Sequence, residues 1–303
     1  MRGAILFCTV DYILEIMQKI IKNFIQAPVA QLGNLDNLFI ELSHRACNLR
    51  CKHCYIEKNP YKQEKDFIET DRIKRALGDL GEHKLKSIYL TGGEPLLHPD
   101  FNQILRMCLK VTSTTILTNG MLVNEKKARF LRKIDDESEF ETIYRISFEH
   151  FDELKNDDLR GRGSFRKAFN AAAGLIKYGF NPIISTVNYY GETREALYDG
   201  FYSLFKKIGF DFESINLKIT PYIKRGEKEP VYNFSGVDVT KVDCINSRTL
   251  SKKGVFSCPM LSGDFRARMG NDLANFSKRT VLDTDFCQDC LKHDGRGFAN
   301  DWD

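Results

Sequence analysis

The chain lacks the long apolar run that a transmembrane helix needs. A helix that crosses a bilayer takes about 20 consecutive apolar residues, and no stretch of the 303 residues approaches that length. A secretory leader is lacking too, because the apolar run at residues 4–10 is followed by Asp11 and Glu15 with no cleavage-like site. We therefore expect a chain that does not span a membrane.

Long blocks of one charge are also missing. Lys and Arg total 45 against 41 Asp and Glu, and the resulting charge of +4 is spread along the chain rather than gathered into basic runs. Proteins that bind nucleic acids through phosphates carry clustered basic residues. The charge pattern therefore argues against a nucleic-acid partner.

Cysteines are plentiful, but their number does not fit a disulfide framework. There are nine, an odd number, and without a leader this indicates the reducing cytoplasm. Cys108 lies inside an apolar segment, so we expect it to be a small buried hydrophobe. Cys8 is interpreted in the same way, with a catalytic hydrogen donor as the alternative. The seven other cysteines fall into two groups, at residues 47–54 and 244–290.

Three parts are expected along the chain, at residues 1–35, 36–225 and 226–303. The first carries an amphipathic helix over residues 11–26, ended by Pro28. Packing on the main domain is the expected role of this helix, and docking to a membrane surface or a partner is the alternative. The last part has too little apolar periodicity to build a core, so we expect a metal group to hold it together.

Between residues 37 and 222, short apolar runs alternate with amphipathic segments. Helices are expected near 70–81, 100–110, 124–133, 164–178 and 193–208. The strands are expected at 37–42, 86–93, 114–120, 142–148, 181–188 and 214–222. Strands that are apolar on both faces belong in a buried parallel sheet. The sequence therefore predicts an α/β fold, a partial (β/α)6 TIM-like barrel with a small C-terminal cysteine-rich extension.

Informative segments follow each of these strands. In parallel sheets, ligands bind at the carboxyl ends of the strands, where the following loops converge. After the cysteine loop come TGGEP (91–95), TNG (118–120), SFEHFD (147–152), TVN (186–188) and TPYIKRGE (220–227). All six segments are therefore expected on one rim.

The first cysteine group has the pattern Cys47-x3-Cys51-x2-Cys54. Three thiolates at this spacing reach one metal centre from a single loop. Zinc would take a fourth ligand, for which His44 or His53 is at hand. An iron-sulfur cube held by three thiolates would instead leave one iron open to a ligand.

With Tyr55 next to the third cysteine, this loop resembles the cluster loop of the radical S-adenosylmethionine (SAM) superfamily. The resemblance implies that the three thiolates hold a 4Fe-4S cluster whose open iron binds the amino and carboxylate groups of SAM. TGGEP resembles the Gly-Gly-Glu-Pro segment with which the family binds the SAM amino group. Gly92 and Gly93 are expected there because residues without Cβ let the backbone approach a ligand closely, and Glu94 would accept from the ammonium.

Other rim residues resemble the family less specifically. Ser147 and Glu149 would approach the ribose and methionine groups of SAM, and Arg160, in LRGRGSF, would pair with its carboxylate. Helix capping or core packing explains each of these residues singly just as well. The resemblance implies these cofactor contacts: Tyr55, Gly92, Gly93, Glu94, Pro95, Asn119, Ser147, Glu149, Arg160 and Asn188.

The second cysteine group completes a four-thiolate set, because Cys287-x2-Cys290 has metal-site spacing and Cys244 and Cys258 add two ligands. Zinc and a 4Fe-4S cluster both accept four thiolates, and spacing by itself favours zinc. Cys244-x9-Gly254-x3-Cys258 resembles the hairpin that opens the SPASM and twitch extensions of radical SAM enzymes. Its glycine is one position closer to the second cysteine, and four cysteines stand where seven are usual. The resemblance implies one auxiliary 4Fe-4S cluster.

The implied function is that of a radical SAM enzyme. Such an enzyme reductively cleaves SAM to a 5'-deoxyadenosyl radical, which abstracts a hydrogen atom from a small-molecule or peptide substrate. An external one-electron reductant of the flavodoxin or ferredoxin type is implied as a partner. The competing hypothesis is a non-enzymatic protein with structural or partner-binding zinc or iron-sulfur sites.

Overall fold

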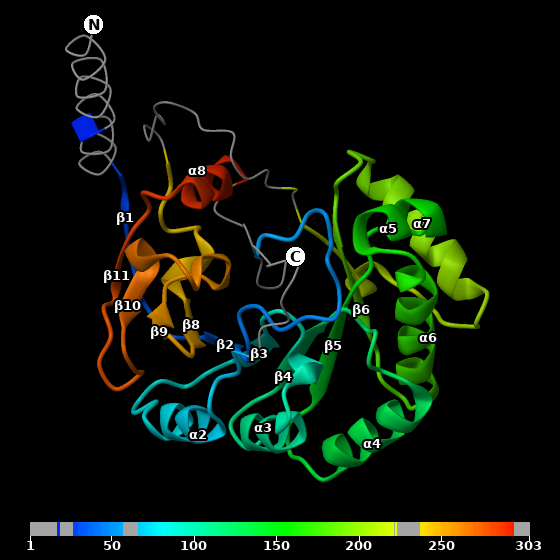
Figure 1. The fold of residues 1–303 in the computed structure, drawn as a ribbon, viewed down its shortest axis with the longest axis horizontal. Coiled ribbons are helices and arrows are strands. Elements are labelled where there is room, and N and C mark those ends of the chain that lie inside the picture. The colour runs from blue at the N-terminus through cyan, green and yellow to red at the C-terminus, as the bar shows by residue number, and fades with distance from the viewer. Residues whose placement is uncertain (1–16, 19–26, 57–65, 221, 223–236, 294–303) are drawn as a thin grey trace, which may run out of the picture.

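The computed structural model describes residues 17–18, 27–56, 66–220, 222 and 237–293 (Figure 1). The amphipathic helix expected over 11–26 lies outside these residues except at positions 17 and 18, and Cys8 lies outside them as well. No helix in the described part combines the length and the apolar character that crossing a bilayer requires.

Six consecutive parallel strands make up one side of a nine-stranded sheet, as far as its edge. Each pairs with the next one along the chain, which confirms the expected succession of strands and helices. All five residues of the first strand are buried, as expected for a sheet covered on both faces. The strands are β2 (Asn37–Glu41), β3 (Ser87–Thr91), β4 (Thr114–Thr118), β5 (Thr142–Ser147), β6 (Ile183–Val187) and β7 (Leu217–Thr220).

The helices between these strands lie on the outer side of the curved sheet (Figure 1). Their apolar faces form the main core with the strands, and Ile104, Leu131 and Leu175 are completely buried there. The bounds of the expected helices are α2 (Thr70–Gly78), α3 (Phe101–Cys108), α4 (Glu125–Asp136), α6 (Ser164–Lys177) and α7 (Arg194–Lys206). This arrangement confirms the α/β fold and the partial barrel.

One helix beside the barrel mouth was not predicted. It is α5 (Glu153–Arg160), whose N-cap Asp152 accepts from Lys155 N at 3.0 Å. Only two of its eight residues are aliphatic, so it lacks the apolar stripe that identifies a helix in sequence. Asp157 then accepts from the backbone N–H groups of Gly163 and Phe165, which fixes the start of α6.

The C-terminal segment has more regular structure than expected. Strand β8 (Ser247–Ser251) pairs in parallel with β2, and β9 (Gly254–Phe256) and β10 (Arg268–Gly270) extend the same sheet in antiparallel fashion. In a second, two-stranded sheet, β1 (Val29–Gln31) pairs with β11 (Arg279–Val281). Helix α8 (Asp285–Lys292) follows. The expected boundary between two parts of the chain at residue 225 stays a prediction. Strand β8 follows this boundary and belongs to the same sheet as β2.

Candidate functional site

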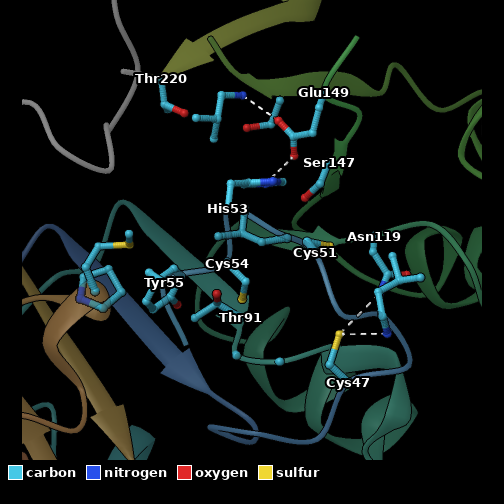
Figure 2. A pocket seen from close by; sticks show the side chains of 18 of the residues that line it. Cys47, Cys51, His53, Cys54, Tyr55, Thr91, Asn119, Ser147, Glu149 and Thr220 are labelled. Atoms are coloured by element: carbon cyan, nitrogen blue, oxygen red, sulfur yellow. Dashed lines mark hydrogen bonds and ion pairs between the residues drawn. The ribbon is translucent and has the colours of Figure 1, made fainter. Parts of the chain in front are cut away.

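A cavity of about 270 Å³ lies at the carboxyl ends of the parallel strands. Figure 2 shows the side chains of the cysteine loop facing those of the strand ends across it. Most of the residues that the sequence singled out are brought together here. The predicted site residues that line the cavity are Cys47, Cys51, Cys54, Tyr55, Gly92, Gly93, Asn119, Ser147, Glu149 and Arg160.

The Gly-Gly pair supports the cysteine loop from one side. Gly93 N donates to Ser43 O and Glu94 N donates to Ala46 O, each at 2.8 Å. A Cβ on Gly92 would lie 2.2 Å from Ser43 O, and one on Gly93 would lie 2.1 Å from Ala46 O. Glycine is therefore required here because the backbone of the cysteine loop comes so close to it. The expected close approach of the two glycines to a ligand stays a prediction.

Further contacts fix the two ends of the loop. Asp66 accepts from the Ser43 hydroxyl and, at 3.1 Å, from Arg45 N. Toward the other end, Lys52 N donates to Leu159 O of α5 at 2.8 Å. The thiol-bearing backbone is thus held between the end of β3 and the end of α5.

Glu149 is the hub of the opposite wall. Its Oε1 lies 2.6 Å from Arg160 Nη1 and 3.1 Å from His53 Nε2, and its Oε2 accepts from Val187 N at 2.7 Å. Burial raises the pKa of Glu149, but the hydrogen bond and charge of His53 and the charge of Arg160 outweigh this and lower the pKa to about 2. The carboxylate is therefore ionised and committed to protein partners.

Arg160 carries its charge permanently. Burial lowers its pKa, but the charge of Glu149, followed by the nearby thiols of Cys51 and Cys47, outweighs burial and raises the pKa. One of its groups, the buried Nε, has no hydrogen-bond partner within the described part of the chain. Arg160 thus lines the cavity while its charge balances that of Glu149.

Three predicted contacts do not line the cavity. The Glu94 carboxylate is buried behind the strand ends, where it accepts from Thr118 Oγ1 and Asn119 N, both at 2.8 Å. Pro95 opens the short 3-10 helix η1 (Pro95–Leu97). Asn188 exchanges two hydrogen bonds with the backbone of Glu192. Glu94 therefore positions the end of β4, and its expected contact with an ammonium stays a prediction.

Asn119, at the end of β4, faces the first cysteine in Figure 2. Its Nδ2 donates to Asn48 Oδ1 at 2.7 Å and lies 3.8 Å from Cys47 Sγ. The Cys47 sulfur also accepts from Leu49 N at 3.4 Å. Two N–H groups, one from the loop and one from the end of β4, thus lie near the Cys47 sulfur.

Neither histidine of the loop points at the thiols as a zinc ligand would. His44 Nδ1 lies 2.8 Å from Glu41 Oε1, and Ser262 Oγ of the C-terminal segment donates to the same oxygen at 2.7 Å. His53 Nε2 faces Glu149, while the His53 Nδ1 is buried and has no partner among the described residues. His53 lines the cavity, and its second nitrogen has no partner in the described part of the chain.

Some cavity residues lie outside the segments expected on the rim. Met260 and Phe286 reach the cavity from the C-terminal segment, and no local pattern connects them with the rim. The further lining residues outside those segments are Phe39, Leu117, Arg145, Ser185 and Pro259. The remaining lining residues lie within the expected segments: Leu49, His53, Thr91, Val187, Thr220 and Tyr222.

The second cysteine group also meets in one place. Cys244, Cys258, Cys287 and Cys290 are all buried and line a small cavity of about 20 Å³. Burial raises the pKa of Cys244 to about 12 and also raises the pKa values of Cys258 and Cys287. The positive charge of a bound metal group would favour the thiolate forms at this position. Within the described ranges, no three His, Cys, Asp or Glu side chains are already gathered around a single-ion position.

Sequence comparison identifies the relatives of this chain. The profile of the radical SAM superfamily matches residues 42–199, just over half of the chain. The antilisterial bacteriocin subtilosin biosynthesis protein AlbA of Bacillus subtilis is 31% identical over 141 residues, which are 46% of this chain and 30% of that protein. GTP 3',8-cyclase of Microcystis aeruginosa is 30% identical over 165 residues, half of this chain and 47% of that enzyme. The chain therefore spans less than half of the length of each of these two relatives.

Solved structures share the fold. Native anSMEcpe with bound AdoMet superposes with a TM-score of 0.59 at 17% identity, over 80% of this chain and 78% of that one. Streptococcus suis SuiB bound to the precursor peptide SuiA gives 0.59 at 16% identity, over 79% and 63%. At such identities the likeness establishes the fold, and the profile match establishes the family. The chain belongs to the radical SAM superfamily.

Proposed function

We propose that this chain is a radical SAM enzyme, with a 4Fe-4S cluster on Cys47, Cys51 and Cys54 and SAM in the adjoining cavity. When bound, the cluster supplies the electron that cleaves SAM to a 5'-deoxyadenosyl radical, which takes a hydrogen atom from the substrate. The observation that carries the proposal is that the three thiols line the same cavity as the strand-end residues.

The cavity has the polar groups that SAM would need. The His53 Nδ1 and the Arg160 Nε are buried without partners among the described atoms, and both residues line the cavity. Buried donors of this kind are normally satisfied, so they fit a polar ligand such as the carboxylate of SAM. The role of Arg160 would be to bind and orient this ligand while Glu149 holds its guanidinium in place.

Apolar residues would protect the reactive centre. Leu49 of the cysteine loop and Met260 and Phe286 of the C-terminal segment line the cavity together with Val187. Side chains that exclude water prevent a reactive species from being quenched before it meets the substrate. Through Met260 and Phe286, the C-terminal segment would therefore contribute to the catalytic cavity.

An auxiliary 4Fe-4S cluster on Cys244, Cys258, Cys287 and Cys290 is the second part of the proposal. Four buried thiols around one cavity fit such a group, because a bound metal would favour their thiolate forms. An external one-electron donor of the flavodoxin or ferredoxin type would supply the electrons. Residues 36–225 would carry the SAM site and residues 226–303 the auxiliary cluster.

A small molecule or a peptide is the proposed substrate. The relatives include a bacteriocin biosynthesis protein and a GTP cyclase, and a structural neighbour was solved with a precursor peptide. These names support both classes of substrate. A screen would test deuterated candidate substrates in the presence of SAM. Transfer of deuterium from a candidate into 5'-deoxyadenosine would be the signature of hydrogen abstraction.

The first experiment measures iron, labile sulfide and zinc per chain after anaerobic reconstitution. We expect roughly eight irons in the wild type and roughly four after Cys47, Cys51 and Cys54 are replaced together by alanine. Dithionite and SAM should then give 5'-deoxyadenosine with the wild type and none with the triple variant. The matched control is Cys108→Ala, a buried cysteine of α3 outside both groups, which should keep all the iron.

The competing hypothesis makes the opposite forecast. A non-enzymatic zinc protein would contain zinc, no labile sulfide and no SAM-cleaving activity after the same treatment. That result would overturn the proposal.

A further inference from the structure

A buried cation stands beside the second cysteine group. Arg248, on β8, is fully buried and is the largest side chain of the described residues with less than 2% exposure. It lines neither cysteine cavity, so neither proposed metal site explains it directly. Its guanidinium donates to the backbone oxygen of Cys244, and this contact connects it with the second cysteine group.

Neutral acceptors hold the guanidinium. Nη1 donates to Cys244 O at 2.7 Å and to Ser247 O at 2.8 Å, and Nη2 donates to Lys278 O at 3.0 Å and to Ser277 O at 3.3 Å. The ring of Phe276 lies 5.8 Å from the guanidinium carbon. The Nε has no partner, and no carboxylate of the described residues forms an ion pair with Arg248.

Such an arrangement is electrostatically incomplete. Carbonyl oxygens satisfy N–H groups, but they do not cancel a full charge, and a buried unpaired ion costs several kcal/mol. Buried arginines are therefore expected to have an anion nearby. The near group that can become negative is the thiol of Cys244, with three further thiols behind it around the same small cavity.

We propose that Arg248 is the counter-charge of the auxiliary cluster and raises its reduction potential. This inference rests on the proposed function, since it takes the four thiolates to hold a 4Fe-4S group. Four thiolate charges outweigh the charge of such a core, and one-electron reduction adds another negative charge. A fixed cation next to Cys244 favours the more negative, reduced form, so Arg248 makes electron acceptance from the external reductant easier.

The test is a potentiometric titration followed by electron paramagnetic resonance. It uses full-length protein in which Cys47, Cys51 and Cys54 are alanine, so that the auxiliary cluster is the one observed. In this background Arg248→Gln removes the charge, Arg248→Lys keeps it, and Arg279→Gln removes an exposed charge on β11. Iron and sulfide are counted in every sample.

Arg248→Gln should shift the reduced-to-oxidised ratio at fixed potential about tenfold toward the oxidised form, a change of ~59 mV for one electron. Arg248→Lys and Arg279→Gln should leave the ratio close to that of the parent. If the Gln variant loses its iron while the Lys variant keeps it, the requirement for a cation is likewise supported.

Three results would overturn the inference about Arg248 while leaving the proposed function intact. Two of them are a full cluster with unchanged potential in Arg248→Gln, and equal shifts in the Gln and Lys variants. Equal loss of iron from both variants would also overturn it, because geometry rather than charge would then be essential. Zinc without iron in the parent would overturn the auxiliary-cluster proposal and the redox role of Arg248 together.

Discussion

The Nε2 atom of His53 lies 3.1 Å from Oε1 of Glu149, so the cysteine loop is joined to the end of β5 by a buried hydrogen bond. Arg160, at the end of α5, meets the same carboxylate oxygen at 2.6 Å. The cysteine loop and the end of α5 thus converge on one carboxylate. Several consequences of this convergence, and of the glycine contacts beneath the loop, are open to measurement.

Replacing Glu149 by glutamine should destabilise the protein to an extent that depends on pH. Glu149 has a pKa of about 2 in the folded protein against an ordinary value of 4.5. This difference corresponds to about 3 kcal/mol of stability that is present above pH 4.5 and lost as the pH falls toward 2. Urea unfolding of wild type and Glu149→Gln should show the difference at pH 7, and the gap should narrow below pH 4.5.

A matched control for this experiment is Glu153→Gln, which removes a more exposed carboxylate paired with Arg166 on the surface. Surface pairs contribute little, so its effect should stay within about 1 kcal/mol. A constant gap between Glu149→Gln and wild type from pH 7 down to pH 3 would contradict the prediction.

The glycine next to the cysteine loop should not tolerate a methyl group. In Gly93→Ala, Cβ would lie 2.1 Å from Ala46 O, so the loop backbone has to move away from β3. We expect a loss of at least half of the iron bound by the Cys47 loop and a destabilisation of about 2 kcal/mol or more. Iron content and thermal unfolding measure the two effects.

Gly78, the last residue of α2, is the corresponding control because a Cβ there meets nothing within 4 Å. Gly78→Ala should retain all the iron and change stability by no more than about 1 kcal/mol, with stabilisation the expected direction. If Gly93→Ala behaved like Gly78→Ala, the loop would not depend on this contact.

The free nitrogen of His53 should contribute to SAM binding. His53→Phe keeps a ring of similar size but removes both nitrogens, the buried Nδ1 without a described partner and the Nε2 that contacts Glu149, in a residue that lines the cavity. One lost hydrogen bond is worth about 1 kcal/mol, so the Kd for SAM should rise roughly five- to tenfold. Anaerobic calorimetric titration of reconstituted protein would measure it, and equal values for wild type and variant would rule out the contact.

His83→Phe is a suitable comparison for that titration. His83 lies beside Phe276, with a centroid distance of 6.2 Å, and does not line the cavity. Its replacement should leave the affinity for SAM unchanged.

Removing one ligand of the second group should separate the two proposed clusters. Cys287→Ala should lower the iron from roughly eight to roughly four atoms per chain while the absorbance of the other cluster persists. The proposed auxiliary group would also join η3 (Asp243–Ile245), η4 (Pro259–Leu261) and α8, so its loss should lower the temperature of unfolding. Iron that stays at eight would show that Cys287 is not a ligand.

Local sequence determined much of this protein. Apolar runs such as NLFIEL specified strands because a sheet covered on both faces buries every residue, and the cysteine spacing predicted which thiols would meet. The tertiary structure alone decided the rest. The polar β8 is a strand because β2 offers it an edge, Glu94 turns away from the cavity toward Thr118, and Arg248 lies behind Cys244. Each depends on partners distant in sequence, and local patterns carry no information about such partners.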